Sequence, residues 1–352
     1  MLDVIGFGLA AFLLSYIGVA GLKRWAERRQ ILDIPNERSS HIRPTPRGGG
    51  LAIVVVVLVG WLVVLSLHPG SWVGADLLYV TGAALIAAVS WLDDLHSLSN
   101  RVRFGAHMLG AVLAIWAFGC WTNITLPIIG SLHLGLLGLM LTFLWIVGLT
   151  NAYNFMDGID GIAGGQAVVA GLGWAMLGYL TDQPLVGLMG VLLAAASLGF
   201  LGHNWPPARI FMGDVGSAFL GFTFAVLAVA AAQRDARFAL VGILFVWPFV
   251  FDATFTFLRR LKNGENVFAA HRSHLYQRLV IVGYSHRFVT LLYMGLAAWG
   301  TIWGLVWSRG VVGSGPVIVV TLPLLCVALW AFVDRRDNTH DQRPPKLGDL
   351  VP

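Results

Sequence analysis

Residues 50–67, GLAIVVVVLVGWLVVLSL, form an unbroken apolar run without a single charged residue. A helix needs about 20 mainly apolar residues to cross the hydrocarbon core of a bilayer, so this run is long enough to approach a full crossing. Unpaired backbone groups are too costly in lipid for anything but helices and closed barrels, and a continuous apolar run favours the helix. The stretch therefore predicts a membrane-spanning helix.

The rest of the chain repeats this pattern. Of its 352 residues, 57% are hydrophobic and only 12% are charged, which excludes a soluble enzyme because too few polar side chains remain to cover a surface in water. We expect an all-α, polytopic integral membrane protein with about 11 transmembrane helices, at residues 3–22, 50–67, 77–92, 104–119, 134–152, 162–179, 184–201, 214–232, 238–258, 288–307 and 313–333. No basic residue precedes the first helix, so we expect it to be a retained anchor. Residues 1–333 would form one multi-helix domain and residues 334–352 a polar cytoplasmic tail.

The basic residues predict the orientation of the chain. All but three of its 23 Lys and Arg residues lie in segments that would share one side of the membrane, the exceptions being Arg234, Arg237 and Arg309. Because Lys and Arg are retained on the cytoplasmic face, we expect the N-terminus outside and the C-terminus in the cytoplasm. The net charge of +5 then follows from the topology and from a membrane surface or an anionic substrate, and gives no reason to expect nucleic acid as a partner.

Five acidic residues gather next to the predicted cytoplasmic helix ends: Asp93, Asp94, Asp157, Asp160 and Asp214. Any one of them could be a solvated interfacial residue, but this does not explain why all five occupy the same side. Asp93 and Asp94 follow a helix C-terminus, where the helix dipole disfavours carboxylates, so the pair requires a compensating cation. A divalent metal or a substrate amine would supply that cation.

The segment TNAYNFMDGIDGIAGG (150–165) places Asn151, Asn154, Asp157 and Asp160 three residues apart. Neighbouring members of such a series share a helix face, and the glycines among them let the backbone approach a ligand closely. Asp160 could instead cap the next helix, but two Asn at the end of an apolar helix are costly in lipid unless they find partners. The spacing favours a binding site.

Two further segments combine oxygen ligands with cations. NWPPARIFMGDVGSAFLG (204–221) carries Asn204, Arg209 and Asp214, a combination that suits Mg²⁺ together with a phosphate group. Asp214 could also serve as the N-cap of the following helix. In PRGGG (46–50), Arg47 precedes glycines that allow a close backbone approach to a phosphate.

The long loop after the ninth helix adds His271, Arg272, His274 and Arg278, and Asp252 lies about two turns inside that helix. A lone intramembrane Asp is a functional candidate, although its role stays open. Carboxylates for a metal, cations for phosphates and an apolar helical wall suit an enzyme that joins a charged, nucleotide-like donor to a lipid acceptor. The alternative is a polytopic lipid or solute transporter, whose polar residues should lie near the bilayer midplane.

At these motifs the sequence resembles the polyprenyl-phosphate N-acetylhexosamine-1-phosphate transferases, glycosyltransferase family 4, and looks closest to the O-antigen initiating branch. The resemblance spans most of the chain, in family order, and rests on five segments: PRGGG (46–50), LDDLHSLSNRVRF (92–104), NAYNFMDGIDGIAGG (151–165), PPARIFMGDVGSAFLG (206–221) and DATFTFLRRLKNGENVFAAHRSHLYQRL (252–279). It implies transfer of an N-acetylhexosamine-1-phosphate from a UDP-sugar to undecaprenyl phosphate, with release of UMP. The sugar would be GlcNAc or a 6-deoxy relative such as FucNAc or QuiNAc, and the product would start O-antigen or a related lipopolysaccharide glycan. It also implies Mg²⁺, with Mn²⁺ as an alternative, a bacterial inner membrane location and an active site on the cytoplasmic face.

The resemblance also assigns roles to individual residues. Asp214 looks like the metal ligand, and Asp93 and Asp94 match the acidic pair of the family. We rank the role of this pair as organisers of the metal and the geometry first, and the role of Asp93 as a general base second. An Asp nucleophile that forms an aspartyl-phosphate is the alternative. His274 is assigned to catalysis. Asn154, Asp157 and Asp160 match residues that line the nucleotide site, and His271, like His274, matches the late histidine motif, which is thought to handle the diphosphate or the sugar. From the residue patterns we add further candidates for substrate binding: Arg47, Asn151, Asn204, Arg209, Arg272 and Arg278. Where relatives commonly carry His-x-His-His, this chain reads His271-Arg272-Ser273-His274, which argues against the peptidoglycan translocase branch. The sequence leaves open whether the chain acts alone or as a homodimer.

Overall fold

The computed structural model describes residues 4–35, 43–67, 73–267, 269 and 271–341. Helices dominate this part of the chain, and two small antiparallel sheets accompany them. In chain order the elements are α1 (Val4–Arg29), β1 (Leu32–Asp33), β2 (Thr45–Pro46), α2 (Gly50–Leu67), α3 (Val73–His96), α4 (Asn100–Phe118), β3 (Asn123–Leu126), β4 (Gly130–His133), α5 (Leu136–Phe155), α6 (Ile162–Leu180), α7 (Pro184–Asn204), α8 (Asp214–Ala232), α9 (Arg237–Phe245), α10 (Trp247–Lys262), α11 (Leu275–Ile281), α12 (His286–Ser308) and α13 (Ser314–Asp341).

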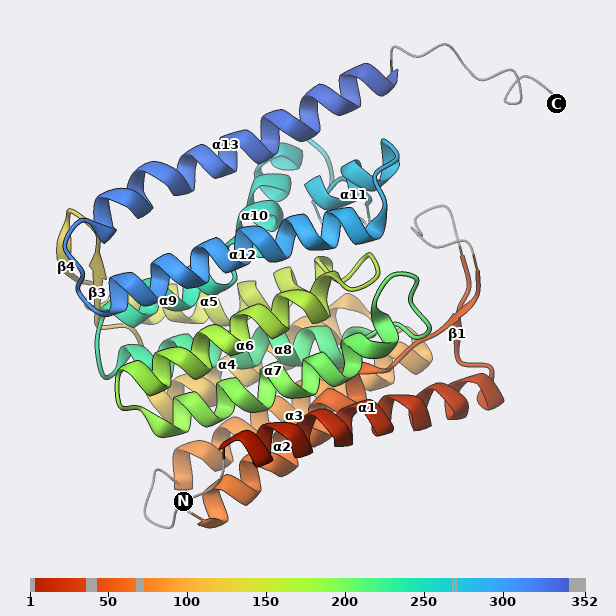
Figure 1. Ribbon diagram of the computed structural model, residues 1–352, viewed down its shortest axis with the longest axis horizontal. Helices are drawn as coiled ribbons and strands as arrows, with labels where there is room; N and C mark the ends of the chain where they lie inside the picture. Colours follow the sequence, from red (N-terminus) through yellow and green to blue (C-terminus); the bar gives the residue numbers. More distant parts are fainter. Residues whose placement is uncertain (1–3, 36–42, 68–72, 268, 270, 342–352) are drawn as a thin grey trace.

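Most of the long helices run side by side and form one bundle, with α8 inside it (Figure 1). In the most apolar 18-residue stretch of α8, 89% of the residues are buried within the protein, against 17% in the corresponding stretches of α1 and α13. A helix that is apolar all round must be surrounded by other helices, which explains the central position of α8. The outer helices instead expose apolar side chains, as expected of a surface that faces lipid.

Small residues allow α6 and α7 to pack closely. A Cβ atom added at Gly171 of α6 would lie 2.6 Å from the backbone nitrogen of Ala194 in α7, a distance that no side chain tolerates. Glycine at such contacts lets two backbones approach each other, which is a common way for helices to associate in membranes. This contact holds the start of α6 next to the end of α7, where several candidate residues lie.

The prediction of an all-α polytopic membrane protein is confirmed. Among the described residues, nine helices are long and apolar enough to cross a membrane, or ten if the bent pair α9 and α10 counts as one span. The predicted span 104–119 forms α4, which is not among them because Asn100, Arg101 and Arg103 in its first turn make it less apolar.

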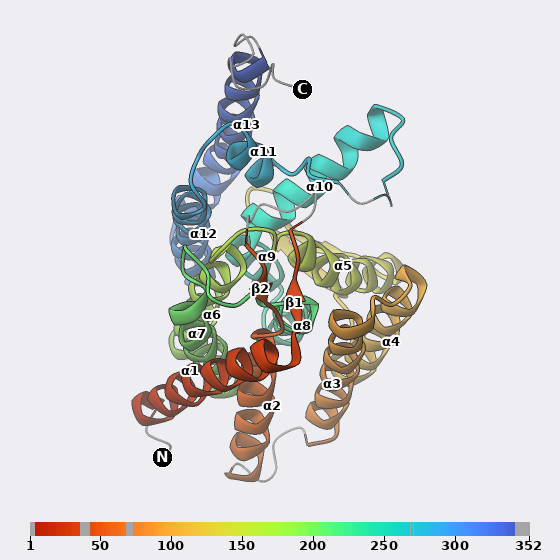
Figure 2. The same ribbon diagram turned by 90° about the vertical axis from the view of Figure 1, so that its right-hand side faces the viewer.

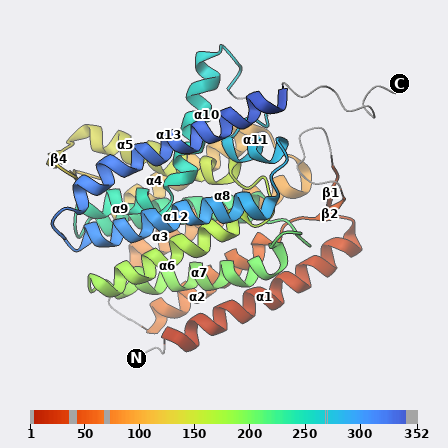
Figure 3. The ribbon, with the colours of Figure 1, turned by 45° about the horizontal axis from the view of Figure 1, so that its top comes forward.

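One predicted helix is wrong as a continuous element. Residues 238–258 form α9 and α10, which meet at Val246 with a bend of 79°. Pro248 explains the break, because proline has no N–H to donate and its ring clashes with the carbonyl four residues earlier in a continuing helix. It is tolerated near the start of a new helix, where that N–H would have no partner, and α10 consequently stands out from the other helices (Figures 2 and 3).

Four smaller features were not predicted, and one of them is the short helix α11, which lies in the predicted loop after the ninth helix. The pairs β1–β2 and β3–β4 are antiparallel and lie in segments that the sequence indicated only as loops. The last helix, expected to end at residue 333, continues to Asp341 and so enters the segment expected to be the polar tail.

Candidate active site

The N-terminus of α8 is capped by a carboxylate from α3. The backbone N–H of Asp214 donates a hydrogen bond of 3.1 Å to one carboxylate oxygen of Asp94, and the N–H of Val215 donates one of 3.1 Å to the other oxygen. The N-terminal end of a helix carries partial positive charge and unpaired N–H groups, so it stabilises the buried Asp94 carboxylate. The alternative that Asp214 caps its own helix is therefore wrong, because the N-cap position is Gly213 and the capping carboxylate comes from Asp94.

Gly213 makes this contact possible. Its φ of +78° lies in the left-handed region, and a Cβ atom there would be 2.5 Å from an oxygen of Asp94. Only glycine combines that backbone conformation with so close an approach.

Arg47 caps the end of α3. Its guanidinium donates hydrogen bonds to the backbone carbonyls of Asp93 and Asp94, with Nε 2.8 Å from the Asp94 oxygen, and Nη2 lies 3.5 Å from the Asp94 carboxylate. A cation at a helix C-terminus offsets the negative end of the dipole. The compensating cation that the acidic pair requires is thus supplied in part by the chain itself.

Arg103 supplies a second positive charge to the acidic pair. Its Nη1 atom lies 2.8 Å from Asp93 Oδ2 and 2.9 Å from Asp214 Oδ2, so one guanidinium joins α3 to the start of α8. Asp93 also accepts a hydrogen bond of 2.5 Å from the backbone N–H of Leu98. Along the chain Asp93 is 10 residues from Arg103 and Asp214 is 111 residues from it, yet both carboxylates contact this one cation.

Asn154 fixes the other side of Asp214. Its amide donates to Asp214 Oδ2 at 3.1 Å, and its amide oxygen accepts from the Ser217 hydroxyl at 3.0 Å. The prediction that an Asn at the end of an apolar helix must find polar partners is confirmed for this residue. We call the group Asp93, Asp94, Arg103, Asn154 and Asp214 the carboxylate cluster.

Asp157 lies in the turn between α5 and α6 and is partly buried. Desolvation raises the pKa of its carboxyl well above the ordinary value, and the negative charges of Asp214, Asp94 and Asp160 raise it further. Among the described residues, no hydrogen bond to this carboxylate is found. An acidic side chain in such a negative environment favours a cation nearby.

Asp160, Asn204 and Arg209 belong to a loop assembly beside the cluster. Asp160 accepts a hydrogen bond of 3.0 Å from the backbone N–H of Ala208 and lies 3.3 Å from His286 Nδ1 of α12. Asn204 is buried and accepts from the N–H of Gly161 at 2.9 Å, so it joins the end of α7 to the start of α6. Arg209 is exposed, and the described residues offer its guanidinium no hydrogen bond.

Asp252, whose role the sequence left open, holds the short helix α11. Its fully buried carboxylate accepts hydrogen bonds from the backbone N–H groups of Leu275 at 2.8 Å and Tyr276 at 3.1 Å. It also accepts from the hydroxyls of Tyr293 at 2.6 Å and Thr256 at 3.1 Å, and His274 Nδ1 lies 3.3 Å away. A buried charge is tolerated when it is so fully hydrogen-bonded, and here it fixes the place of His274.

Tyr276 connects α11 to the acidic turn. Its hydroxyl donates to the backbone carbonyl of Phe155 at 3.0 Å and would clash with any side chain at Gly158. The Gln277 amide is also close to Gly158. The late histidine segment and the Asp157–Gly158 turn, far apart in the sequence, are therefore in contact.

The remaining predicted residues lie around this region with partners of their own. Asn151 donates to the carbonyl of Val147 in its own helix at 2.7 Å. His271 Nδ1 lies 3.0 Å from the Ser273 hydroxyl, its ring is 5.0 Å from that of His274, and Arg272 between them is partly buried. Arg278 is directed to α13, where it pairs with Asp334 and Asp337.

Arg103 is the site residue that the sequence analysis missed. It lies in the first turn of α4, where a basic side chain is unfavourable because the helix dipole is positive there. That mismatch was the available signal, since a cation placed against the dipole requires nearby carboxylates.

Comparison with known proteins identifies relatives. Residues 77–232 match the model of the family described as "Glycosyl transferase family 4", a range that contains the whole carboxylate cluster. A Bacillus subtilis (strain 168) protein, "Probable undecaprenyl-phosphate N-acetylglucosaminyl 1-phosphate transferase", is 33% identical over 81% of this chain and 80% of its own length. A "Decaprenyl-phosphate N-acetylglucosaminephosphotransferase" of Mycobacterium tuberculosis (strain ATCC 25618 / H37Rv) is 32% identical over 83% of this chain and 80% of its own. A "Phospho-N-acetylmuramoyl-pentapeptide-transferase" of Synechococcus sp. (strain JA-2-3B'a(2-13)) is 32% identical over 87% and 92% respectively.

Proposed function

The chain belongs to glycosyl transferase family 4, and on this premise we propose that it transfers an N-acetylhexosamine-1-phosphate from a UDP-sugar to undecaprenyl phosphate and releases UMP. Its relatives support an enzyme that moves a sugar phosphate onto a polyprenyl phosphate within a membrane. The observation that carries the proposal is the carboxylate cluster at one end of the bundle. There Arg103 of α4 pairs with Asp93 of α3 and Asp214 of α8, Asn154 of α5 donates to Asp214, and Asp94 of α3 accepts from the N-terminus of α8.

The donor atoms of this cluster suit Mg²⁺ bound together with a diphosphate. Mg²⁺ usually takes only one or two protein carboxylates and completes its octahedron with water and substrate phosphates. Within the described residues no group of three or more His, Cys, Asp or Glu side chains is arranged as a metal site by itself. Asp214 would hold Mg²⁺, since its carboxylate is only partly buried and its partners Arg103 and Asn154 are both side chains that can move. When bound, the ion would neutralise charge on the transferring phosphoryl group.

The side chains of the protein would perform the remaining tasks. Phosphoryl transfer depends mainly on positioning and charge neutralisation, and Arg47 and Arg103 already place two cations beside the acids. The Arg209 guanidinium, which has no hydrogen bond to the residues that the structure describes, could bind a phosphate oxygen. Because a phosphate monoester has its second pKa at about 6, the lipid acceptor is largely dianionic near neutral pH and needs little help from a base. We therefore assign Asp93 and Asp94 to geometry first and Asp93 to base catalysis second.

The finer assignments follow from the same reasoning. We propose GlcNAc or a 6-deoxy relative as the sugar, start of an O-antigen or related surface glycan as the pathway, and the cytoplasmic face of the inner membrane as the place of reaction. The names of the bacillary and mycobacterial relatives specify N-acetylglucosamine, which supports UDP-GlcNAc as the first donor to test. The Arg and Lys distribution supports a cytoplasmic site.

The experiment uses purified protein in detergent with Mg²⁺, undecaprenyl phosphate and a panel of UDP-N-acetylhexosamines. The lipid product is identified by mass spectrometry. Asp214→Asn should lower the rate at least about a thousandfold, because phosphoryl transfer would lose several kcal/mol of charge stabilisation. Asp182→Asn is the matched control: Asp182 is exposed beyond the far end of α6, and its φ of +54° is one that asparagine tolerates.

A lipid-linked sugar diphosphate made from one donor would identify both reaction and sugar. If no donor reacted while the protein was folded and bound undecaprenyl phosphate, the transferase proposal would fall and the transporter alternative would be favoured. Retained catalysis in Asp93→Asn would exclude Asp93 as base and as nucleophile.

A further inference from the structure

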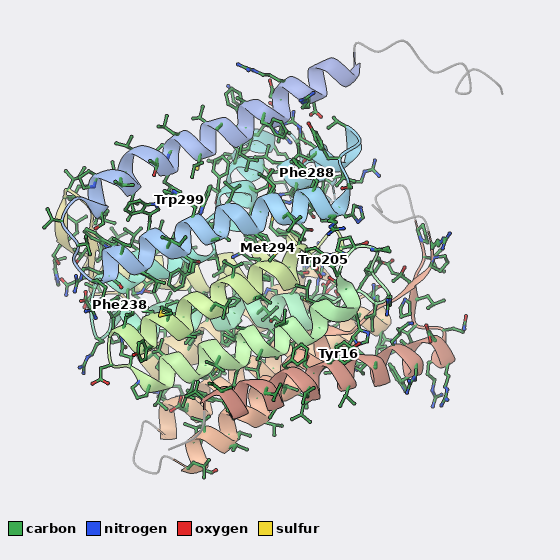
Figure 4. All side chains as sticks on the ribbon, in the orientation of Figure 1. Tyr16, Trp205, Phe238, Phe288, Met294 and Trp299 are labelled. Atoms are coloured by element: carbon green, nitrogen blue, oxygen red, sulfur yellow. The ribbon has the colours of Figure 1, made fainter. Side chains whose placement is uncertain are left out.

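A second charged site lies at the opposite end of the bundle. A cavity of about 330 Å³ is lined by residues from the end of α6, the turn between α8 and α9, the start of α9, and the end of α12. Figure 4 shows Phe238, one of its lining residues, at the other end of the molecule from Trp205 and Phe288. The 19 residues of α6 separate the cavity from the start of that helix by about 28 Å, close to the thickness of a bilayer core.

Three arginines line this cavity: Arg234, Arg237 and Arg309. They are also the three basic residues that the predicted topology leaves on the outer side of the membrane. Because Lys and Arg are depleted from that side, three on one cavity wall are not explained by topology. Their convergence from two separate loops indicates a binding role.

The charges of the cavity are only partly compensated. Arg237 makes a bidentate pair with Asp235, in which Nη2 lies 2.6 Å from Oδ2 and Nε lies 3.1 Å from Oδ1. Arg309 donates a hydrogen bond to the backbone carbonyl of Leu180, and its other N–H groups are available to a ligand. Arg234 is exposed, and its guanidinium has no hydrogen bond to any residue that the structure describes. Three arginines against one carboxylate leave two positive charges for a ligand.

The position of the cavity indicates what that ligand is. Tyr179, next to the lining residue Leu180, is 83% exposed, and Leu172 on the same helix is 58% exposed. Tyrosine at the end of an exposed apolar helix face is typical of the boundary between lipid and water. The arginines therefore lie at the level of lipid headgroups, and guanidinium groups bind phosphate oxygens in forked pairs. We propose that this cavity binds the phosphate group of an anionic lipid headgroup.

The test is a titration of the full chain in detergent with phosphatidylglycerol, followed by native mass spectrometry. A basic residue near the membrane surface contributes about 1 kcal/mol to anionic lipid binding, so Arg234→Ala with Arg309→Ala should weaken the tightest site about 30-fold. Arg234→Ala alone should weaken it about fivefold, and since Arg234 has no described partner this variant should fold even if the double variant does not. Arg335→Ala, which removes an exposed arginine from α13, should leave binding unchanged.

A gain of affinity provides a second, independent arm. Asp235→Asn keeps a side-chain oxygen for the α9 N-terminus but removes the negative charge, so phosphatidylglycerol should bind about fivefold more tightly. A purely structural role for these residues predicts no such gain. Equal affinity of the wild type and Arg234→Ala would overturn the site. Displacement of the lipid from the wild type by millimolar inorganic phosphate would overturn the lipid assignment in favour of a free anion.

Discussion

Replacing Asp252 by alanine should release α11 from the bundle. The buried carboxylate accepts five hydrogen bonds, and two of the donors are backbone N–H groups of Leu275 and Tyr276. The Thr256 and Tyr293 hydroxyls can rotate toward other acceptors, but the two backbone donors cannot. An unsatisfied buried donor costs about 1–3 kcal/mol, so the free energy of opening α11 should fall by about 2–6 kcal/mol.

Hydrogen–deuterium exchange of residues 275–281 measures this opening directly. A loss of about 2 kcal/mol corresponds to exchange that is roughly 30-fold faster, and this is the smallest effect we expect. Tyr293→Phe is the matched control, because it removes one donor to the same carboxylate and leaves both backbone contacts in place. UMP release should also fall in Asp252→Ala, since α11 contacts the turn at Gly158. Unchanged exchange across α11 in the alanine variant would refute this reasoning.

Three further predictions concern the acidic end of the bundle. Gly213→Ala forces an alanine into φ of +78° and places its Cβ 2.5 Å from an oxygen of Asp94, so both Tm and the rate of UMP release should fall, the rate at least about tenfold. Arg103→Gln leaves two carboxylates without their shared cation, so the metal-free protein should melt at a lower temperature and Mg²⁺ should raise Tm more than in the wild type. Desolvation and neighbouring acids raise the pKa of Asp157, so above about pH 4 the folded chain binds one more proton than the unfolded chain. The stability of the folded chain therefore falls as pH rises toward that raised pKa. Without metal, Tm should fall less between pH 4 and pH 8 in Asp157→Asn than in the wild type.

The helices were predictable because long apolar runs leave few alternatives in a membrane. The break at Val246 was not, since hydropathy averaged over a window does not register one residue with φ of −124° and ψ of 13°. Pro248 was the local signal, but proline also occurs within the intact helix α13, at Pro323, so its presence alone does not decide between a continuous and a broken helix.

The acids of the site were predictable because each lies at a helix end on the same predicted face. Their partners were harder to predict because they depend on contacts between distant segments. Arg103 is 111 residues from Asp214, and Arg278 pairs with Asp334 in a segment that the sequence indicated only as a tail. The role of Asp252 likewise required knowledge of where α11 docks.

The most direct test of the central claim is the ratio of the two products of one reaction. We predict that with UDP-GlcNAc, undecaprenyl phosphate and Mg²⁺ the wild type forms UMP and lipid-linked sugar diphosphate in equal amounts, and that a chelator or Asp214→Asn abolishes both together. UMP formed without the lipid product, or equal product formation by Asp214→Asn, would contradict the account.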